Sequence, residues 1–298
     1  LNVGCIPSKA LITASDLDVD DTLTYSAANL PSGGTFDPAT GVFSWIPDFT
    51  QSGSYADVTF TVTDNGAPNL NDSETITITV NDMPVDSWYV DASVPSSGFG
   101  ISWATAFKTI SEALAAAVPG NTIYVNDGIY TEDLVVATPG VTLESVNGRD
   151  ATTIQLVTGT GITIEGTADN FILGGTASTG FTILSSLAGG TTHNIELVNG
   201  PSNVEISYNT IDTTGDAVTG ISVDSAGATG LQIAGNNFIA EDGDGSVWGA
   251  KLLNVNVSDN VFTGPGGPPA NGYAIEFAGV TGTSVISDNT ISGYAMGI

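Results

Sequence analysis

One short phrase recurs in the last third of this 298-residue chain and limits its fold more than any other feature. Each copy has an apolar residue, an Asn three positions later, and a second apolar residue two positions after the Asn. The Asn residues recur every 24 to 29 positions, at Asn209, Asn236, Asn260 and Asn289. A period of this length in strand-forming residues predicts a solenoid, in which successive copies stack on one another.

Stacking places the four Asn side chains in one column. Each amide N–H then donates to the carbonyl of the next Asn, which satisfies polar groups that are costly to bury unpaired. A second apolar phrase alternates with the first, so each coil is predicted to hold more than one strand. We assign this second phrase to residues 195–197, 220–223, 250–253, 274–277 and 297–298.

Residues 88–298 resemble the right-handed parallel β-helix of the pectate-lyase-like superfamily. The repeated Asn phrase carries this resemblance in the last third of the chain. Segments between residues 89 and 132 resemble the opening of many secreted bacterial β-helix proteins. The resemblance implies the architecture and says little about activity.

One helix is predicted, over residues about 103–118. Phe107, Ile110 and Leu114 recur at helical spacing, and the Pro-Gly pair at 119–120 ends the segment. A single amphipathic helix has one apolar stripe to bury, and the open end of the β-helix is the available partner. We therefore expect these three side chains to be buried cap residues rather than the lining of a ligand groove.

Residues 13–82 predict a β-sandwich, because short alternating strands follow one another between turn sequences rich in Gly, Pro and Asp. The segment resembles the cadherin-like or immunoglobulin-like repeats of large bacterial surface proteins, and it lacks a first strand of its own. Residues 83–87 form a linker to the β-helix. The expected fold class is therefore all-β: an immunoglobulin/cadherin-like sandwich, then a parallel β-helix with one N-terminal capping helix.

Residues 1–12 resemble the redox-disulfide motif of dihydrolipoamide dehydrogenase and related flavin disulfide reductases. That chemistry needs two thiols beside a flavin, whereas Cys5 is the only cysteine and no Gly-rich dinucleotide motif follows it. We expect this peptide to be a foreign stub that occupies the place of the missing sandwich strand. No flavin and no reductase activity are expected.

The charge balance narrows the choice of partners. The chain has 32 acidic residues against 4 Lys and Arg, a formal net charge of −28. Such a surface repels nucleic acid and anionic lipid, so neither is an expected partner. No apolar run reaches the ~20 residues of a membrane span. Because the sequence stops within a repeat, we expect a fragment of a longer, C-terminally truncated chain that is extracellular or attached to the cell surface.

A calcium site is one interpretation of the acids before the first long strand. Carboxylates at alternate loop positions bind a hard cation through oxygen, and the cadherin-like resemblance adds two further acids from other loops. The candidate ligands are Asp16, Asp18, Asp20, Asp21, Asp64 and Asp82. The spacing is not that of an EF-hand, because Asp21 and Ala27 stand where Gly and Glu are needed. The alternative is that these acids simply occupy exposed turns.

The β-helix has no recognisable catalytic constellation. The resemblance implies lyases that use an Arg or Lys base, but only Lys108, Arg149 and Lys251 are available and nothing in the sequence brings them together. Related hydrolases need converging carboxylates and carry motifs that are missing here. His193 is expected in a turn or on the surface. The acidic loop from Glu241 to Asp244 is expected to face solvent, with calcium binding as the alternative.

Two functions follow as hypotheses. The preferred one is a modular bacterial surface or secreted protein that acts in adhesion or carbohydrate binding, with calcium dependence left open. Its partners are then a glycan or another host or cell-surface ligand, and neighbouring repeat modules of the same parent chain. The alternative is a polysaccharide lyase or glycoside hydrolase whose site lies outside this sequence or in loops such as 241–248 and 264–271.

Overall fold

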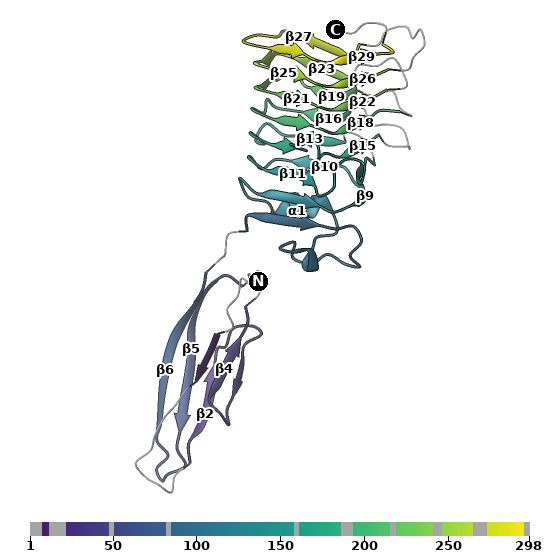
Figure 1. Ribbon diagram of the computed structural model, residues 1–298. Coiled ribbons are helices and arrows are strands. Elements are labelled where there is room, and N and C mark those ends of the chain that lie inside the picture. Colours follow the sequence, from purple (N-terminus) through teal and green to yellow (C-terminus); the bar gives the residue numbers. More distant parts are fainter. Residues whose placement is uncertain are drawn as a thin grey trace. The chain divides into compact units, whose positions relative to one another are not determined.

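The computed structural model describes residues 8–11, 22–47, 51–81, 85–157, 161–185, 193–214, 219–240, 246–264 and 273–294. It divides into two compact units, Leu1–Pro84 and Val85–Ile298 (Figure 1). Both units consist of strands, apart from one α-helix and one 3-10 turn in the second. The predicted all-β class is therefore confirmed.

The first unit is a sandwich of two three-stranded antiparallel sheets, ordered β1-β4-β3 and β2-β5-β6. Its strands are β1 (Ser8–Leu11), β2 (Thr24–Ala28), β3 (Thr35–Asp37), β4 (Val42–Trp45), β5 (Gly53–Thr63) and β6 (Asn71–Val80). Phe43 and Trp45 from one sheet pack with Val58 and Phe60 from the other. The indole of Trp45 also meets the ring of Tyr55 edge-on, with centroids 4.9 Å apart.

Part of the expected foreign stub is built into this sandwich. Strand β1 pairs antiparallel with β4, with Ser8 opposite Trp45 and Leu11 opposite Val42. It therefore lies where the sequence places the stub, in the position of a first strand. Residues 1–7, including Cys5, lie outside the described residues. The foreign origin of this peptide stays a prediction, but Ser8–Leu11 belongs to the sandwich by its pairing.

The second unit is a parallel β-helix with three sheets, named here sheets A, B and C in the order in which each coil visits them. Sheet A comprises β7 (Ser87–Val90), β8 (Thr122–Val125), β11 (Thr142–Ser145), β14 (Ile172–Leu173), β17 (Glu205–Ser207), β21 (Gln232–Ala234), β25 (Asn256–Ser258) and β28 (Val285–Ser287). Sheet B comprises β9 (Gly128–Thr131), β12 (Thr152–Gln155), β15 (Thr182–Leu184), β18 (Thr210–Asp212), β22 (Asn237–Ile239), β26 (Val261–Thr263) and β29 (Thr290–Ser292).

Sheet C comprises β10 (Leu134–Val136), β13 (Ile162–Ile164), β16 (His193–Leu197), β19 (Thr219–Val223), β23 (Val247–Ala250) and β27 (Ile275–Ala278). A small two-stranded sheet of β20 (Ala228–Thr229) and β24 (Leu252–Leu253) lies between sheets C and A in the chain. Every ladder in this unit is parallel and pairs each strand with the matching strand of the next coil. The strands therefore stack in the way that the repeat spacing predicts.

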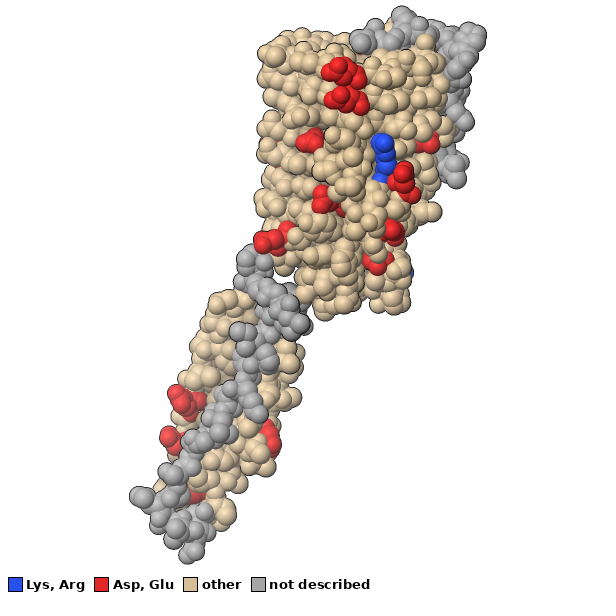
Figure 2. All heavy atoms as spheres, in the orientation of Figure 1, with Lys and Arg blue, Asp and Glu red and all other residues tan. Residues whose placement is uncertain are grey.

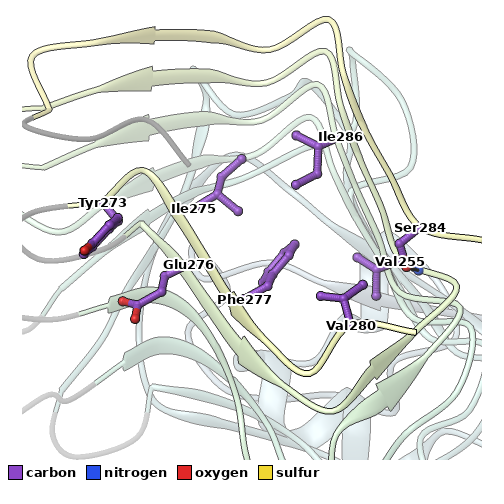
Figure 3. A pocket seen from close by; sticks show the side chains of 8 residues that line it. All are labelled: Val255, Tyr273, Ile275, Glu276, Phe277, Val280, Ser284 and Ile286. Atoms are coloured by element: carbon purple, nitrogen blue, oxygen red, sulfur yellow. Dashed lines mark hydrogen bonds between the residues drawn. The ribbon is translucent and has the colours of Figure 1, made fainter. Parts of the chain in front are cut away.

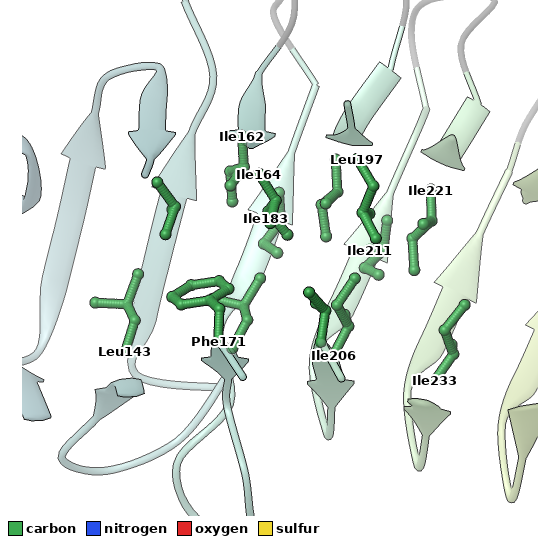
Figure 4. Close-up of a cluster of buried hydrophobic side chains, with 14 of the residues drawn as sticks. Leu143, Ile162, Ile164, Phe171, Ile183, Leu197, Ile206, Ile211, Ile221 and Ile233 are labelled. Atoms are coloured by element: carbon green, nitrogen blue, oxygen red, sulfur yellow. The ribbon is translucent and has the colours of Figure 1, made fainter. Parts of the chain in front are cut away.

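Apolar side chains form continuous columns inside the coils (Figure 4). In sheet A, for example, Leu143, Leu173, Ile206 and Ile233 lie in register on neighbouring strands, and all four are fully buried. In sheet B the column includes two rings, Phe238 and Phe262, stacked with centroids 4.6 Å apart. Full burial of one such side chain stabilises a fold by about 1.5–3 kcal/mol, so these columns hold the coils together.

The predicted Asn column runs along the corner between sheets A and B. Nδ2 of Asn209 donates to Oδ1 of Asn236 at 3.3 Å, and Asn236 donates to Asn260 at 3.1 Å. Asn260 donates in turn to Asn289 at 2.9 Å. Each of these Oδ1 atoms also accepts a hydrogen bond from the backbone N–H of the preceding Asn in the column. The side chains therefore satisfy one another in the interior.

The capping helix is shorter than the predicted 103–118. Helix α1 spans Ile110–Ala116, and a separate 3-10 turn, η1, spans Trp103–Thr105. Thr109 ends the extended segment between them, because its side chain and that of Glu112 form a capping box that starts the helix there. Ile110 and Leu114 are buried against the core, as expected, whereas Phe107 packs on it from outside the helix. No helix among the described residues is long and apolar enough to cross a membrane.

One predicted segment of the second phrase was wrong. The strand of sheet C in this coil is β23 (Val247–Ala250) and not 250–253, where Leu252–Leu253 forms β24. The cause is Gly249, which takes an inward position that is apolar in other coils. The space beside it is filled by Leu252, whose Cδ1 lies 3.0 Å from where a Cβ on Gly249 would stand. A side chain from the next strand thus replaces the missing one.

Candidate functional site

The connections from sheet B to sheet C are the most variable part of each coil. Two residues separate β9 from β10, whereas eleven separate β26 from β27. Long connections on a rigid scaffold are where binding residues concentrate. The outer face of sheet C, which these connections border, is therefore the candidate binding surface.

One outward column crosses sheet C from strand to strand. Its members, in order, are Val135, Thr163, Glu196, Ser222, Trp248 and Glu276. Neighbouring members are about 4.8 Å apart, the usual distance between paired strands. Trp248 is 37% exposed and Ser222 beside it only 2%. The large side chain of Trp248 therefore lies next to the small, buried side chain of Ser222. Glu276 lies on the strand beyond Trp248, and Glu196 lies on the strand beyond Ser222.

Trp248 is the most unusual residue of this face. Its indole makes no hydrogen bond or ring contact within the part of the chain that the structure describes. Large aromatic residues usually bury their rings, and Trp is typical of binding surfaces that are partly apolar and partly wet. The strand carries it outward because Val247 and Gly249 occupy the inward positions on either side. Trp248 is thus an outward, partly exposed aromatic residue on this face.

The two carboxylates of this column do not form a catalytic pair. Glu196 and Glu276 lie three strands apart, a Cα separation of about 14 Å, with Trp248 on an intervening strand. Glycosidases place their two carboxyl groups about 5–5.5 Å or about 6.5–9.5 Å apart. The described part of the column therefore resembles a binding surface more than a hydrolytic site.

A second pair of acids follows sheet C at its other edge, and the structure uses it to fix turns. Oδ1 of Asp224 accepts from the backbone N–H of Ala226 at 2.8 Å, and Oδ2 accepts from that of Asn199 at 3.0 Å. Oε2 of Glu165 accepts from Nδ2 of Asn199 at 3.1 Å. Both oxygens of Asp224 are occupied by the backbone, which suits a structural role better than proton transfer.

The sequence placed His193 in a turn or on the surface. It starts strand β16, opposite Thr219 of β19, and is half-buried. Burial lowers the pKa of its imidazole, and the nearby carboxylate of Glu196 opposes this shift. Its Nδ1 is buried and has no hydrogen-bond partner among the described residues. Burial thus favours the neutral imidazole, and the residue lies where the connection from sheet B enters sheet C.

Most of the predicted calcium ligands lie outside the described residues: Asp16, Asp18, Asp20, Asp21 and Asp82. Asp64 is described, and its Oδ1 accepts from the backbone N–H groups of Gly66 at 3.1 Å and Leu70 at 2.9 Å. One of its oxygens thus organises its own loop. The described residues contain no group of three or more His, Cys, Asp or Glu that is placed to hold a metal ion.

The basic residues considered for a lyase are not brought together. Arg149 lies on the A–B corner and donates from Nη1 to the carbonyl oxygen of Asn209 at 3.3 Å. Lys251 lies between β23 and β24 on the C–A side, and Lys108 precedes the capping helix. The acidic loop from Glu241 to Asp244 lies outside the described residues.

A cavity of about 380 Å³ lies in the last described coil (Figure 3). Its apolar lining includes Ile275 and Ile286, which continue the inward columns of sheets C and A. Ile286 is 38% exposed, whereas Val257, directly below it in the column, is fully buried. The cavity is therefore the open cross-section of the core and not a separately built ligand site.

Comparison with known proteins bears on the first unit most clearly. Residues 6–81 match the family model described as a putative Ig domain. The first unit is an Ig-like domain. The match begins at residue 6 and so includes β1. No curated protein matched the chain.

Among solved structures, the chain is similar to the Family 28 exopolygalacturonase of Yersinia enterocolitica. The alignment has 13% sequence identity and a TM-score of 0.26, and it covers 97% of this chain and 84% of that one. Similarity at this level supports no argument about activity.

Proposed function

We propose that the β-helix binds an uncharged glycan on the outer face of sheet C, around Trp248. The observation that carries this proposal is the exposed indole of Trp248 between Ser222 and Glu276 on neighbouring strands. A sugar ring packs its apolar C–H face on an indole, and its hydroxyl groups donate to carboxylates at the rim. Both kinds of group are available along this column.

The charge of the chain supports an uncharged ligand. With 32 acids and 4 bases, the formal net charge is −28, and Figure 2 shows acidic residues at many points of the visible face with few basic ones. Polyuronates and sulfated glycans are repelled by such a surface, and more strongly at low salt. Neutral polysaccharides carry no such penalty.

The proposal includes the setting of the molecule. An Ig-like domain followed by a β-helix suits a modular extracellular or cell-surface protein that acts in adhesion, with cadherin-like character in its first unit. A glycosidase or lyase remains the alternative function, with its reacting groups in the connections from sheet B to sheet C. The separation of Glu196 from Glu276 favours binding over hydrolysis.

The test is a screen of the whole chain against neutral oligosaccharides, with hexagalacturonate as the anionic comparison, read by calorimetry and by analysis of products. We expect saturable binding of a neutral hexasaccharide and no shortening of it. New reducing ends or unsaturated products would replace this proposal with the enzymatic alternative. Absence of binding to every neutral oligosaccharide would contradict it.

Calcium binding is part of the proposal for the first unit. The candidate ligands remain Asp16, Asp18, Asp20, Asp21, Asp64 and Asp82, because alternating carboxylates suit a hard cation. Calcium titration followed by thermal melting tests it: saturable binding raises the melting temperature, and the Asp18→Ala/Asp20→Ala double variant loses the effect. The Glu74→Ala variant is the matched control, since Glu74 lies within strand β6, opposite Phe60 of β5. Unchanged melting in calcium would reject the site.

A further inference from the structure

We propose a second glycan-binding site, on the outer face of sheet A at the first coils, formed by an exposed group of aromatic side chains. The site, named here the aromatic platform, consists of Tyr89, Trp103 and Tyr124 with the carboxylate of Glu144. It goes beyond the Trp248 face, because it lies on a different sheet and near the opposite end of the described β-helix.

The register of sheet A aligns the platform. Tyr89 on β7 pairs with Tyr124 on β8, and Tyr124 pairs with Glu144 on β11, so these three side chains point outward in one column. The two tyrosine rings have centroids 5.7 Å apart and an interplanar angle of 30°. Trp103 meets Tyr89 edge-on, with centroids 4.8 Å apart. Three rings thus form one contiguous surface.

The platform is partly exposed. Trp103 is 41% exposed, and Tyr89 and Tyr124 are half-buried. Within the described residues, neither tyrosine hydroxyl nor the indole N–H of Trp103 has a hydrogen-bond partner in the protein. Adjacent exposed aromatic rings with free polar ends are typical of interaction sites.

The loop that carries Trp103 is firmly built. The backbone N–H of Gly98 donates to the carbonyl oxygen of Ala106 at 2.9 Å, and that of Gly100 donates to the carbonyl oxygen of Thr105 at 2.6 Å. Gly100 has φ +72°, and a Cβ there would overlap the ring of Phe107. A Cβ on Gly98 would overlap the backbone of Thr105. The ring of Trp103 is therefore held in place before any ligand arrives, which lowers the entropic cost of binding.

Glu144 indicates what kind of ligand the platform takes. Its carboxylate is half-buried beside Tyr124 and has no hydrogen-bond donor among the described residues, and burial raises its pKa. A partly desolvated carboxylate without a donor is satisfied by a ligand that donates. A sugar hydroxyl does so while the ring packs on the aromatic faces. An anionic ligand is repelled by the same carboxylate. A neutral oligosaccharide supplies both the hydroxyl donors and the apolar ring faces that this surface can take, and it is the ligand class of the proposal.

The fluorescence test reports on this site and not on the Trp248 face, because it uses the Trp248→Phe chain, in which position 248 has no indole. The remaining tryptophans are then Trp45, which is buried, Trp88, which donates to Asn121, and the exposed Trp103. Cellohexaose, xylohexaose and mannohexaose are titrated while tryptophan emission and its quenching by acrylamide are recorded. We expect one of them to protect Trp103 from acrylamide, and Trp103→Phe to abolish the signal.

Calorimetry gives the matching affinities in a Trp248→Ala background. Adding Tyr124→Ala is expected to lower the association constant at least about tenfold, equivalent to about 1.4 kcal/mol. Tyr208→Ala, which removes a comparably exposed ring on the A–B corner, is expected to leave it unchanged. Equal melting temperatures of the variants exclude a folding defect as the cause.

Three results would overturn the platform. The first is that none of the three hexasaccharides changes the tryptophan fluorescence of the Trp248→Phe chain. The second is that adding Tyr124→Ala to the Trp248→Ala chain leaves the affinity unchanged. The third is that hexagalacturonate binds in preference to the neutral sugars. Failure of the Trp248 proposal looks different: Trp248→Ala then binds as tightly as the wild type, while the Tyr124→Ala effect persists.

Discussion

Nδ2 of Asn236 donates to Oδ1 of Asn260 across 3.1 Å, in the middle of a column that ties four coils together. The same Nδ2 donates to the carbonyl oxygen of Ile206 at 2.8 Å. Oδ1 of Asn236 accepts from the backbone N–H of Asn209 at 2.9 Å. One buried side chain therefore serves backbone and side-chain groups of both neighbouring coils.

Asn236→Ala is expected to destabilise the β-helix by roughly 3 kcal/mol, because it leaves buried donors and acceptors of neighbouring coils without partners. Urea unfolding followed by circular dichroism measures the loss. The matched control is Asn237→Ala, which alters the next residue, on the outer face of sheet B, and is expected to change stability by about 0.5 kcal/mol or less. Equal effects of the two substitutions would show that the column does not stabilise the fold.

Gly180→Ala is expected to be among the most damaging single methyl additions in the chain. A Cβ at this position would overlap the carbonyl oxygen of Tyr208 in the next coil, and a backbone atom cannot move aside as a side chain can. Gly120→Ala is the control: its φ is +88°, but a Cβ there meets nothing within 4 Å. That variant should be destabilised only by the conformational cost of a left-handed backbone, about 1–2 kcal/mol. Thermal melting distinguishes the two, and a smaller loss for Gly180→Ala would contradict the coil packing.

Two Glu→Gln substitutions are expected to shift stability in opposite directions at pH 7. Burial raises the pKa of Glu144 in the folded protein. The contribution of Glu144 to the stability of the fold is therefore fully present below its unfolded pKa of about 4.3, and it is lost as the pH rises through the folded pKa. Hydrogen bonds from Ser97 and Thr109 lower the pKa of Glu112, so its contribution is present above that unfolded pKa and lost in acid. Glu144→Gln should therefore raise the melting temperature and Glu112→Gln should lower it.

The two differences should both shrink as the pH falls below 4, where the wild-type carboxyl groups are protonated in the unfolded chain. Melting curves between pH 3 and pH 7 check this. A decrease in melting temperature for Glu144→Gln at pH 7 would mean that the Glu144 carboxylate has a donor that satisfies it.

Much of the β-helix could be predicted because stacked coils need the same types of residue at equivalent positions. The Asn column and the inward residues such as Ile206 and Ile233 recur at a fixed offset, which a single sequence reveals. The limits of α1 could not be predicted from the spacing of Phe107 and Ile110, because the Thr109–Glu112 capping box sets the start of the helix. That box was itself visible in the sequence as a Thr followed three residues later by Glu.

The candidate site was harder to predict because outward positions follow no period. Trp248 fell inside the loop range 241–248 but was not singled out, since strand β23 was assigned three residues too late. With the strands aligned correctly, Trp248 stands where other coils have Glu196 and Ser222, and the change of residue type is the available signal. The aromatic platform depends on the pairing of β7 with β8, which joins segments whose strands lie far apart in the sequence.

The most direct test of the account is the affinity of the chain for the neutral hexasaccharide that binds most tightly. It is measured by calorimetry for the wild type, Trp248→Ala, Trp248→Phe and Tyr208→Ala, each also in a Tyr124→Ala background that weakens the aromatic platform. We expect Trp248→Ala to lower the affinity of the sheet C site at least about tenfold, about 1.4 kcal/mol. Trp248→Phe should keep most of the affinity, because it keeps a ring, and Tyr208→Ala should equal the wild type. Undiminished binding by Trp248→Ala would contradict the assignment of the outer face of sheet C as the glycan-binding surface.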